Sequence, residues 1–298
     1  MTTLHAAVDL GATSGRVMLA KVGPRDLSLQ EVHRFGHAPL DLVDGLHWDV
    51  TGLYREVLTG LERLPKGVAT LGVDSWAVDY GLLDSRGALL GVPFSYRDDR
   101  TSGVHNTVHA RLSPEQLYAL NGLQFLPFTT IYQLAASELD DAEKLLLLPD
   151  LVGYWLTGTI GAEITNASTT GLLDVRARTW SPELCVAAGI SQDLLPALHE
   201  PGAELGALRS VVQERTRFEG VVRAVGSHDT ASAVAAVPMD SGRAAYVSLG
   251  TWGLVGVEVE KPVLTEQSRI ANFTNELGVD GRVRFLRNVT GLFLLTEV

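Results

Sequence analysis

The sequence predicts an α/β protein, because stretches with strand periodicity and with helix periodicity alternate along the chain. Residues 4–9 and 17–22 are apolar, β-prone runs on either side of a Gly/Ser/Thr turn at 11–15, which is typical of a β-hairpin. Apolar residues then recur at helical intervals over 49–64 and predict one amphipathic helix. The short apolar run at 68–73 predicts a buried strand that follows this helix.

The rest of the chain extends the same pattern. Residues 27–35 alternate imperfectly and fit a third strand at an edge of the first sheet. The long segment 103–157 is mostly helical in pattern and lacks strand signals. The other expected elements are a second hairpin with strands at 78–83 and 88–93, a buried strand at 221–225 and a helix at 230–237.

The length of 298 residues corresponds to about two domains at roughly 150 residues each. We expect the boundary near 238–242, which divides residues 1–238 from residues 239–298. Beyond it, residues 244–259 repeat the strand, glycine turn and strand of residues 4–22, and this implies a duplicated fold. Because the second part is shorter than a comfortable domain and ends within an apolar run, we expect it to be incomplete.

Charge and composition narrow the function classes. The 24 Lys and Arg residues against 35 Asp and Glu residues give a net charge of −11, so we expect no nucleic-acid partner. Cys185 is the single cysteine, and the first ten residues lack the features of a signal peptide, so we expect a cytoplasmic protein. The aliphatic runs are too short to span a membrane. The sequence does not indicate the oligomeric state.

Common nucleotide and metal motifs are absent. The chain has neither G-x-G-x-x-G nor a Gly-Lys pair for a phosphate-binding Walker loop. His105 and His109 have the i, i+4 spacing of zinc ligands on a helix. Without a third ligand or a base nearby in the sequence, we interpret them as a solvated helix face.

The turn in the first hairpin is a candidate phosphate site. Its small residues expose consecutive backbone N–H groups to an anion, and the hydroxyls of Thr13 and Ser14 and the guanidinium of Arg16 lie beside them. Asp9, at the end of the strand, could hold Mg²⁺ through water. The alternative is an ordinary hairpin turn.

A second turn of the same type, at residues 248–253, follows the predicted domain boundary. Two such hairpins that close on one nucleotide are the plan of the actin, Hsp70 and hexokinase superfamily. We therefore expect an actin-like, hexokinase-like (ribonuclease H-like) two-lobe ATPase fold. This analogy does not name a substrate.

Asp229 is the best candidate for a general base, because it follows a buried strand and precedes a helix, where α/β proteins place their sites. Two alternatives remain open. Asp229 could be a helix N-cap, and the neighbouring His228 could be a hydrogen-bonded core residue.

Several segments together resemble the FGGY family of carbohydrate kinases over nearly the whole chain. The more specific of them are the Gln-Phe-Leu-Pro-Phe run at 124–128 and the His-Asp-Thr run at 228–230. The other matching segments are residues 9–19, 31–35, 81–84, 96–101, 132–134 and 148–150.

The resemblance implies transfer of the γ-phosphoryl group of ATP, with Mg²⁺, to the 1-hydroxyl of a ketose, L-rhamnulose. It implies that Asp229 is the base. The sugar contacts that it implies are His228, Thr230, Asn288 and the backbone around Ala77. The ATP phosphate contacts that it implies are Ala12, Thr13, Ser14, Gly15, Arg16 and Thr251.

Two alternatives accompany this expectation. Ala77 stands where family members usually have Gly, and the added methyl group beside the sugar leaves open another ketose or polyol as substrate. The chain could also be an inactive sugar-binding remnant, because family members extend well past residue 298 and the adenosine pocket is expected in that part.

Overall fold

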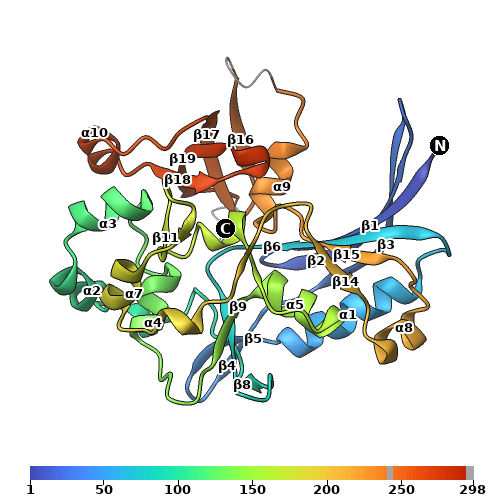
Figure 1. The fold of residues 1–298 in the computed structure, drawn as a ribbon, viewed down its shortest axis with the longest axis horizontal. Helices are drawn as coiled ribbons and strands as arrows, with labels where there is room; N and C mark the ends of the chain where they lie inside the picture. Colours follow the sequence, from blue (N-terminus) through green and yellow to red (C-terminus); the bar gives the residue numbers. More distant parts are fainter. Residues whose placement is uncertain (240–243, 293–298) are drawn as a thin grey trace.

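The structure, a computed structural model, describes residues 1–239 and 244–292. Its largest element is a six-stranded sheet (Figure 1). In spatial order its strands are β14 (Glu204–Ala207), β15 (Val221–Arg223), β6 (Val68–Ser75), β1 (Thr3–Leu10), β2 (Ser14–Val22) and β3 (Leu27–Gly36). β1 pairs antiparallel with β2 and parallel with β6, and in the latter register Asp9 lies opposite Asp74. The Asp9 and Asp74 carboxylates therefore lie next to each other, at the carboxyl ends of two adjacent strands.

Helix α1 (Val50–Glu62) covers one face of this sheet. It begins where the Asp49 carboxylate accepts the N–H of Gly52 at 2.7 Å, a side-chain cap of the kind that stabilises a helix start by about 1 kcal/mol. Gly60 lets the helix approach β2, because a Cβ atom there would lie 2.3 Å from Cγ2 of Val17. Helices α5 (Leu148–Thr157) and α8 (Ser210–Thr216) share the same hydrophobic core (Figure 1).

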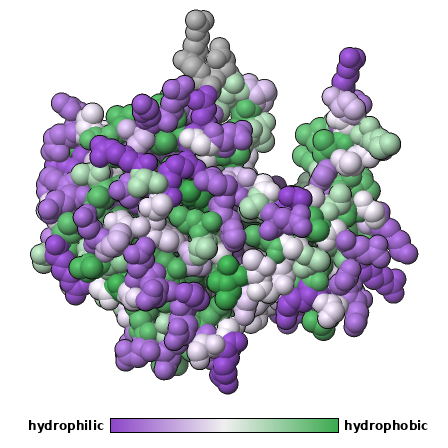
Figure 2. Space-filling view, viewed as in Figure 1, coloured by the Kyte–Doolittle hydropathy of each residue, from purple (hydrophilic) through white to green (hydrophobic). Residues whose placement is uncertain are grey.

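A smaller antiparallel sheet lies on the other side, next to α9 (Asp229–Ala235) (Figure 1). Its strand order is β16 (Ala245–Leu249), β17 (Trp252–Val259), β19 (Val283–Thr290) and β18 (Thr274–Leu277). Tyr246, Leu254 and Leu286 form a small core with Val234 of α9. Figure 2 shows that the surface is notched between this part and the projecting N-terminal strands.

The remaining elements are short strands, helices and 3₁₀ turns that connect these parts. The remaining strands are β4 (Pro39–Leu42), β5 (Gly45–Trp48), β7 (Tyr80–Leu83), β8 (Leu89–Leu90), β9 (Lys144–Leu147), β10 (Ala162–Glu163), β11 (Leu173–Asp174), β12 (Thr179–Trp180) and β13 (Leu198–His199). The remaining helices are α2 (His105–Arg111), α3 (Pro114–Asn121), α4 (Thr130–Ala135), α6 (Ile164–Ala167), α7 (Pro182–Ala188) and α10 (Glu266–Ile270). Short 3₁₀ turns lie at Asp99–Thr101, Gln192–Leu194 and Val279–Gly281.

The structure confirms the α/β class, both N-terminal hairpins, the edge position of β3 and the hairpin β16–β17. The expectation of a strand-free segment over 103–157 is wrong. Lys144–Leu147 forms β9, which pairs antiparallel with β7, and its three leucines are fully buried. A short apolar run has no periodicity that separates a buried strand from a helix.

The predicted domain boundary falls partly on residues 240–243, which lie outside the described residues. None of the described helices is both long and apolar enough to cross a membrane.

Candidate active site

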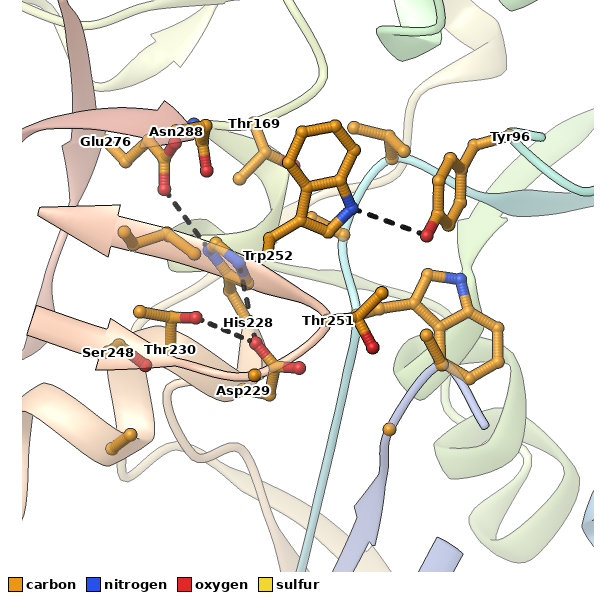
Figure 3. Close-up of a pocket in the computed structure, with 18 of the residues that line it drawn as sticks. Tyr96, Thr169, His228, Asp229, Thr230, Ser248, Thr251, Trp252, Glu276 and Asn288 are labelled. Atoms are coloured by element: carbon orange, nitrogen blue, oxygen red, sulfur yellow. Dashed lines mark hydrogen bonds and ion pairs between the residues drawn. The ribbon is translucent and has the colours of Figure 1, made fainter. Parts of the chain in front are cut away.

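A cavity of about 470 Å³ lies where the ends of β1 and β6, the start of α9 and the β16–β17 turn meet (Figure 3). The segments that line it are far apart in the sequence, so the fold assembles the site from both sheets. The predicted site residues in its wall are Asp9, Ala12, Thr13, Arg16, Ala77, His228, Asp229, Thr230, Thr251 and Asn288.

Ser14 and Gly15 are predicted phosphate contacts that the structure does not place in the cavity wall. The carbonyl of Ser14 accepts the N–H of Gly11 at 3.0 Å and closes the turn. A Cβ atom at Gly15 would lie 2.3 Å from the ring of Phe35. Gly15 therefore serves the close packing of β2 on β3.

His37 stabilises the turn at residues 11–15 through its ring and its backbone. Its Nε2 lies 2.7 Å from the carbonyl oxygen of Gly11, and its backbone N–H donates to the carbonyl of Thr13 at 3.1 Å. Burial lowers the pKa of His37, which favours the neutral ring. On the cavity side, Arg16 and Asp9 form an ion pair at 2.7 Å. Both side chains are partly exposed, so an incoming phosphate group can compete for Arg16.

The loop between β15 and α9 is held by a buried carboxylate. Oε2 of Glu163 accepts the N–H of Ser227 at 2.8 Å and its hydroxyl at 3.0 Å. The carbonyl of Ser227 accepts the N–H of Ser75 at 2.9 Å, which joins the loop to the end of β6. These bonds fix His228 and Asp229 at the entrance of α9.

Asp229 is the first residue of α9, and His228 occupies the cap position without a side-chain cap bond. The interpretation of Asp229 as the helix cap is therefore wrong. Its Oδ1 accepts the Thr230 hydroxyl at 3.0 Å and lies 3.6 Å from Nε2 of His228 (Figure 3). Burial, together with the charge of Asp9, raises the pKa of Asp229, while His228 and Thr230 oppose the shift.

Asp74 is a third carboxylate at this sheet edge, and it was not among the predicted site residues. Its Oδ1 is buried and has no hydrogen-bond partner. Burial and then the charges of Asp9 and Asp229 raise its pKa well above the usual value. The sequence signal for Asp74 was its position directly after the strand predicted at 68–73. The structure adds that this strand pairs parallel with β1 and brings Asp74 opposite Asp9.

This concentration of negative charge fits a divalent cation that arrives with phosphate groups. Among the described residues, no three His, Cys, Asp or Glu side chains are arranged to hold a metal alone. Mg²⁺ commonly binds through one or two carboxylates, several waters and the phosphates of its substrate. Asp9 and Asp229 both border the cavity and are suited to that mode.

The second turn carries Thr251 into the cavity wall. The N–H of Gly250 donates to the carbonyl of Trp252 at 2.9 Å and closes this turn. A Cβ atom at Gly291 would lie 2.5 Å from the carbonyl oxygen of Gly250, so the end of β19 packs directly on it. The two turns thus face one cavity from the two sheets.

Aromatic side chains form another wall of the cavity, and Trp252 among them was not a predicted site residue. Trp252 donates its indole N–H to the Tyr96 hydroxyl at 3.4 Å (Figure 3). The Phe128 ring lies 5.2 Å from that of Tyr96 and 5.6 Å from that of Trp252, measured between centroids. Such a wall suits the apolar faces of a sugar ring or chain. Tyr96 and Phe128 lie in segments that resemble the family, and the signal for Trp252 was its position directly after Thr251.

The comparisons with known proteins agree with this geometry. Residues 5–236 match the N-terminal domain of the FGGY family of carbohydrate kinases, and the chain belongs to that family.

Curated relatives include the rhamnulokinase of Pectobacterium atrosepticum, which is 45% identical over 98% of this chain and 60% of its own length. The rhamnulokinase of Bacillus subtilis is 40% identical over 99% of this chain and 62% of its own length. The chain therefore spans about 60% of the length of these relatives.

Solved structures share the fold at low sequence identity. The xylulose kinase of Rhodospirillum rubrum superposes with a TM-score of 0.82 at 18% identity, over 97% of this chain and 61% of that one. Plasmodium falciparum glycerol kinase gives 0.79 at 15% identity, over 99% of this chain and 63% of that one. The actin-like, hexokinase-like two-lobe fold expected from the paired turns is thus confirmed.

Proposed function

We propose that this chain provides the sugar site and the phosphate-binding turns of an ATP-dependent kinase that converts L-rhamnulose to L-rhamnulose 1-phosphate. The observation that carries the proposal is the convergence of Asp229 and the two glycine turns on one cavity. The names of the relatives support the choice of sugar. Residues 1–238 would be the sugar-binding domain and residues 239–298 would belong to the nucleotide-binding domain of a cytoplasmic enzyme.

In this proposal Asp229 accepts the proton of the sugar 1-hydroxyl and orients its oxygen toward the γ-phosphorus of ATP. In a loose phosphoryl-transfer transition state, the attacking hydroxyl loses its proton late. The main contribution of Asp229 is then orientation, and its raised pKa suits a late proton transfer. His228, Thr230 and Asn288 lie in the same wall and would bind the other sugar oxygens.

The phosphate groups would lie between the two turns. Backbone amides of Ala12 and Thr13, together with Arg16 and Thr251, would offset the charge that shifts onto the phosphate oxygens. Mg²⁺ held near Asp9 would supply further charge stabilisation when bound. The two sheets on either side of the cavity would exclude water, which otherwise would accept the phosphoryl group.

Calorimetric titration with four sugars tests the acceptor site directly. We expect L-rhamnulose to bind at least tenfold more tightly than L-fuculose, D-xylulose or glycerol. Asp229→Asn should keep this affinity within a few-fold, because the amide retains the shape of the carboxylate. Equal affinity for all four sugars would contradict the choice of substrate, and a preference for another sugar would assign that one instead.

A further inference from the structure

A largely buried group of ionisable side chains surrounds His228, and two of its members, His228 and Glu276, line the cavity wall. Arg284 has no exposed surface, and Glu276 and His228 retain 5% and 7%. Arg284 and Glu276 face each other across the paired strands β19 and β18, whereas His228 comes from the loop before α9. The group therefore joins the smaller sheet to the residue before the candidate base.

The contacts within this group are short. Nη2 of Arg284 lies 2.9 Å from Nδ1 of His228 and 3.1 Å from Oε2 of Glu276. Nδ1 and Oε2 are 3.3 Å apart (Figure 3). Burial opposes ionisation of Glu276, but the adjacent Arg284 cation helps to keep its pKa below the usual value, so Glu276 is a carboxylate.

These distances determine which imidazole nitrogen of His228 carries the proton. A guanidinium nitrogen can only donate, and Nη2 carries two hydrogens. One hydrogen is donated to Nδ1, which must then accept through its lone pair, and the carbonyl of Leu277 accepts from the same nitrogen at 3.4 Å. Oε2 of Glu276 pairs with Arg284 by charge and has no hydrogen-bond partner. A proton on Nδ1 would point at an N–H group in a dry interior, where such a contact is strongly unfavourable. His228 is therefore the neutral tautomer with its proton on Nε2.

The geometry points to Arg284 as a positioning residue of the sugar site, with Glu276 as its counter-ion. Arg284 holds the Nε2–H of His228 toward the cavity, where Nε2 lies 3.6 Å from Oδ1 of Asp229. His228 is thereby a hydrogen-bond donor to a sugar oxygen, and Asp229 remains the acceptor for the hydroxyl proton. The functional meaning of this division rests on the proposed sugar site, but the tautomer itself does not.

A second predicted sugar contact, Asn288, lines the cavity wall together with Glu276. The backbone of Asn288 is fixed, because the Gln124 amide accepts its N–H at 2.8 Å and donates to its carbonyl at 3.1 Å. Asn288 is therefore supported by Gln124.

Nitrogen NMR of the histidine rings tests the tautomer in the unmodified chain at neutral pH, with His228→Gln to assign the signal. We expect a protonated, pyrrole-type Nε2 and an unprotonated, pyridine-type Nδ1. A proton on Nδ1, in either the other neutral tautomer or the imidazolium, would overturn the inference. This result needs neither sugar nor ATP.

Substitutions then separate positioning from folding. Arg284→Lys removes the planar donor and keeps the charge, so we expect Nδ1 to acquire a proton that it donates to Glu276, and the affinity for L-rhamnulose to fall at least tenfold. Glu276→Gln keeps the Arg284 donor, so the Nε2–H tautomer should persist. Arg287→Lys, at an exposed position of the same strand, should change neither readout.

An unchanged tautomer and affinity in Arg284→Lys would overturn the positioning role. If the Nε2–H tautomer is lost in Glu276→Gln, Glu276 and not Arg284 determines the proton position on His228. That result would also overturn the positioning role of Arg284. If Arg284→Lys does not fold, the unmodified chain and Glu276→Gln still decide the question. Failure of the unmodified chain to bind any of the sugars would refute the proposed function and leave the tautomer assignment standing.

Discussion

Asp229 and Asp79 show how the surroundings of a carboxyl group decide its use. Asp229 opens into the cavity, with 35% of its side-chain surface exposed. Asp79 lies beneath the cavity, and its Oδ2 accepts the indole N–H groups of Trp48 at 2.6 Å and Trp76 at 2.9 Å. The carboxyl of Asp79 is therefore occupied by these two indole groups.

Asp79 predicts a measurable pH dependence of stability. Burial raises the pKa of Asp79 to about 6, against its hydrogen bonds from Trp76, Trp48 and Gln133. The folded state therefore binds this proton more tightly than the unfolded state does, and stability falls as the pH rises through about 6.

Asp79→Asn removes this titration. The free energy of unfolding of the unmodified protein, minus that of the variant, should fall by about 1 kcal/mol from pH 5 to pH 7. Urea unfolding of both proteins at each pH measures the difference. A difference that is constant or rises with pH would contradict a raised pKa.

Helix α1 positions the phosphate turn indirectly, because it packs on β2 directly after that turn. The contact depends on Gly60, where a Cβ atom would meet Cγ2 of Val17 at 2.3 Å and Cβ of Val17 at 2.8 Å. A branched side chain on a strand cannot move away without shifting the strand, so the helix position and the strand position are linked.

Gly60→Ala should lower the free energy of unfolding by about 1–2 kcal/mol, since overpacking outweighs the gain in helix propensity. Gly153→Ala is the matched control within helix α5. A Cβ atom there meets only Cδ1 of Leu205, at an ordinary 3.7 Å. The control should therefore be neutral or stabilising by up to about 1 kcal/mol. Equal effects of the two substitutions in chemical denaturation would show that Gly60 is not a point of close approach.

Local patterns were sufficient to predict the hairpins, helix α1, the two turns and the place of Asp229 after a strand. Each of these depends on residues adjacent in the chain. The support behind the site could not be predicted in this way, because Arg284 lies 56 residues from His228 and meets it only through the pairing of β18 with β19. The buried strand β9 was missed because its leucines have no periodicity to read.

The smaller sheet is connected to the rest of the molecule by polar contacts beside the cavity. Besides the His228 group, the N–H of Asn275 donates to the carbonyl of Gly122 at 2.9 Å, and the N–H of Leu277 donates to the Ser168 hydroxyl at 2.9 Å. The proposed sugar site is thus supported by contacts of the smaller sheet with the residues that follow α3 and α6.

The central claim is that this cavity aligns L-rhamnulose with ATP through Asp229. ADP release by the 298-residue chain, with Mg²⁺-ATP and each of L-rhamnulose, L-fuculose, D-xylulose and glycerol, tests it most directly. We predict ADP formation that depends on L-rhamnulose and falls at least 10²-fold in Asp229→Asn, the loss typical of a removed general base. ADP release that is independent of sugar, or equal in Asp229→Asn, or absent with every sugar, would contradict it.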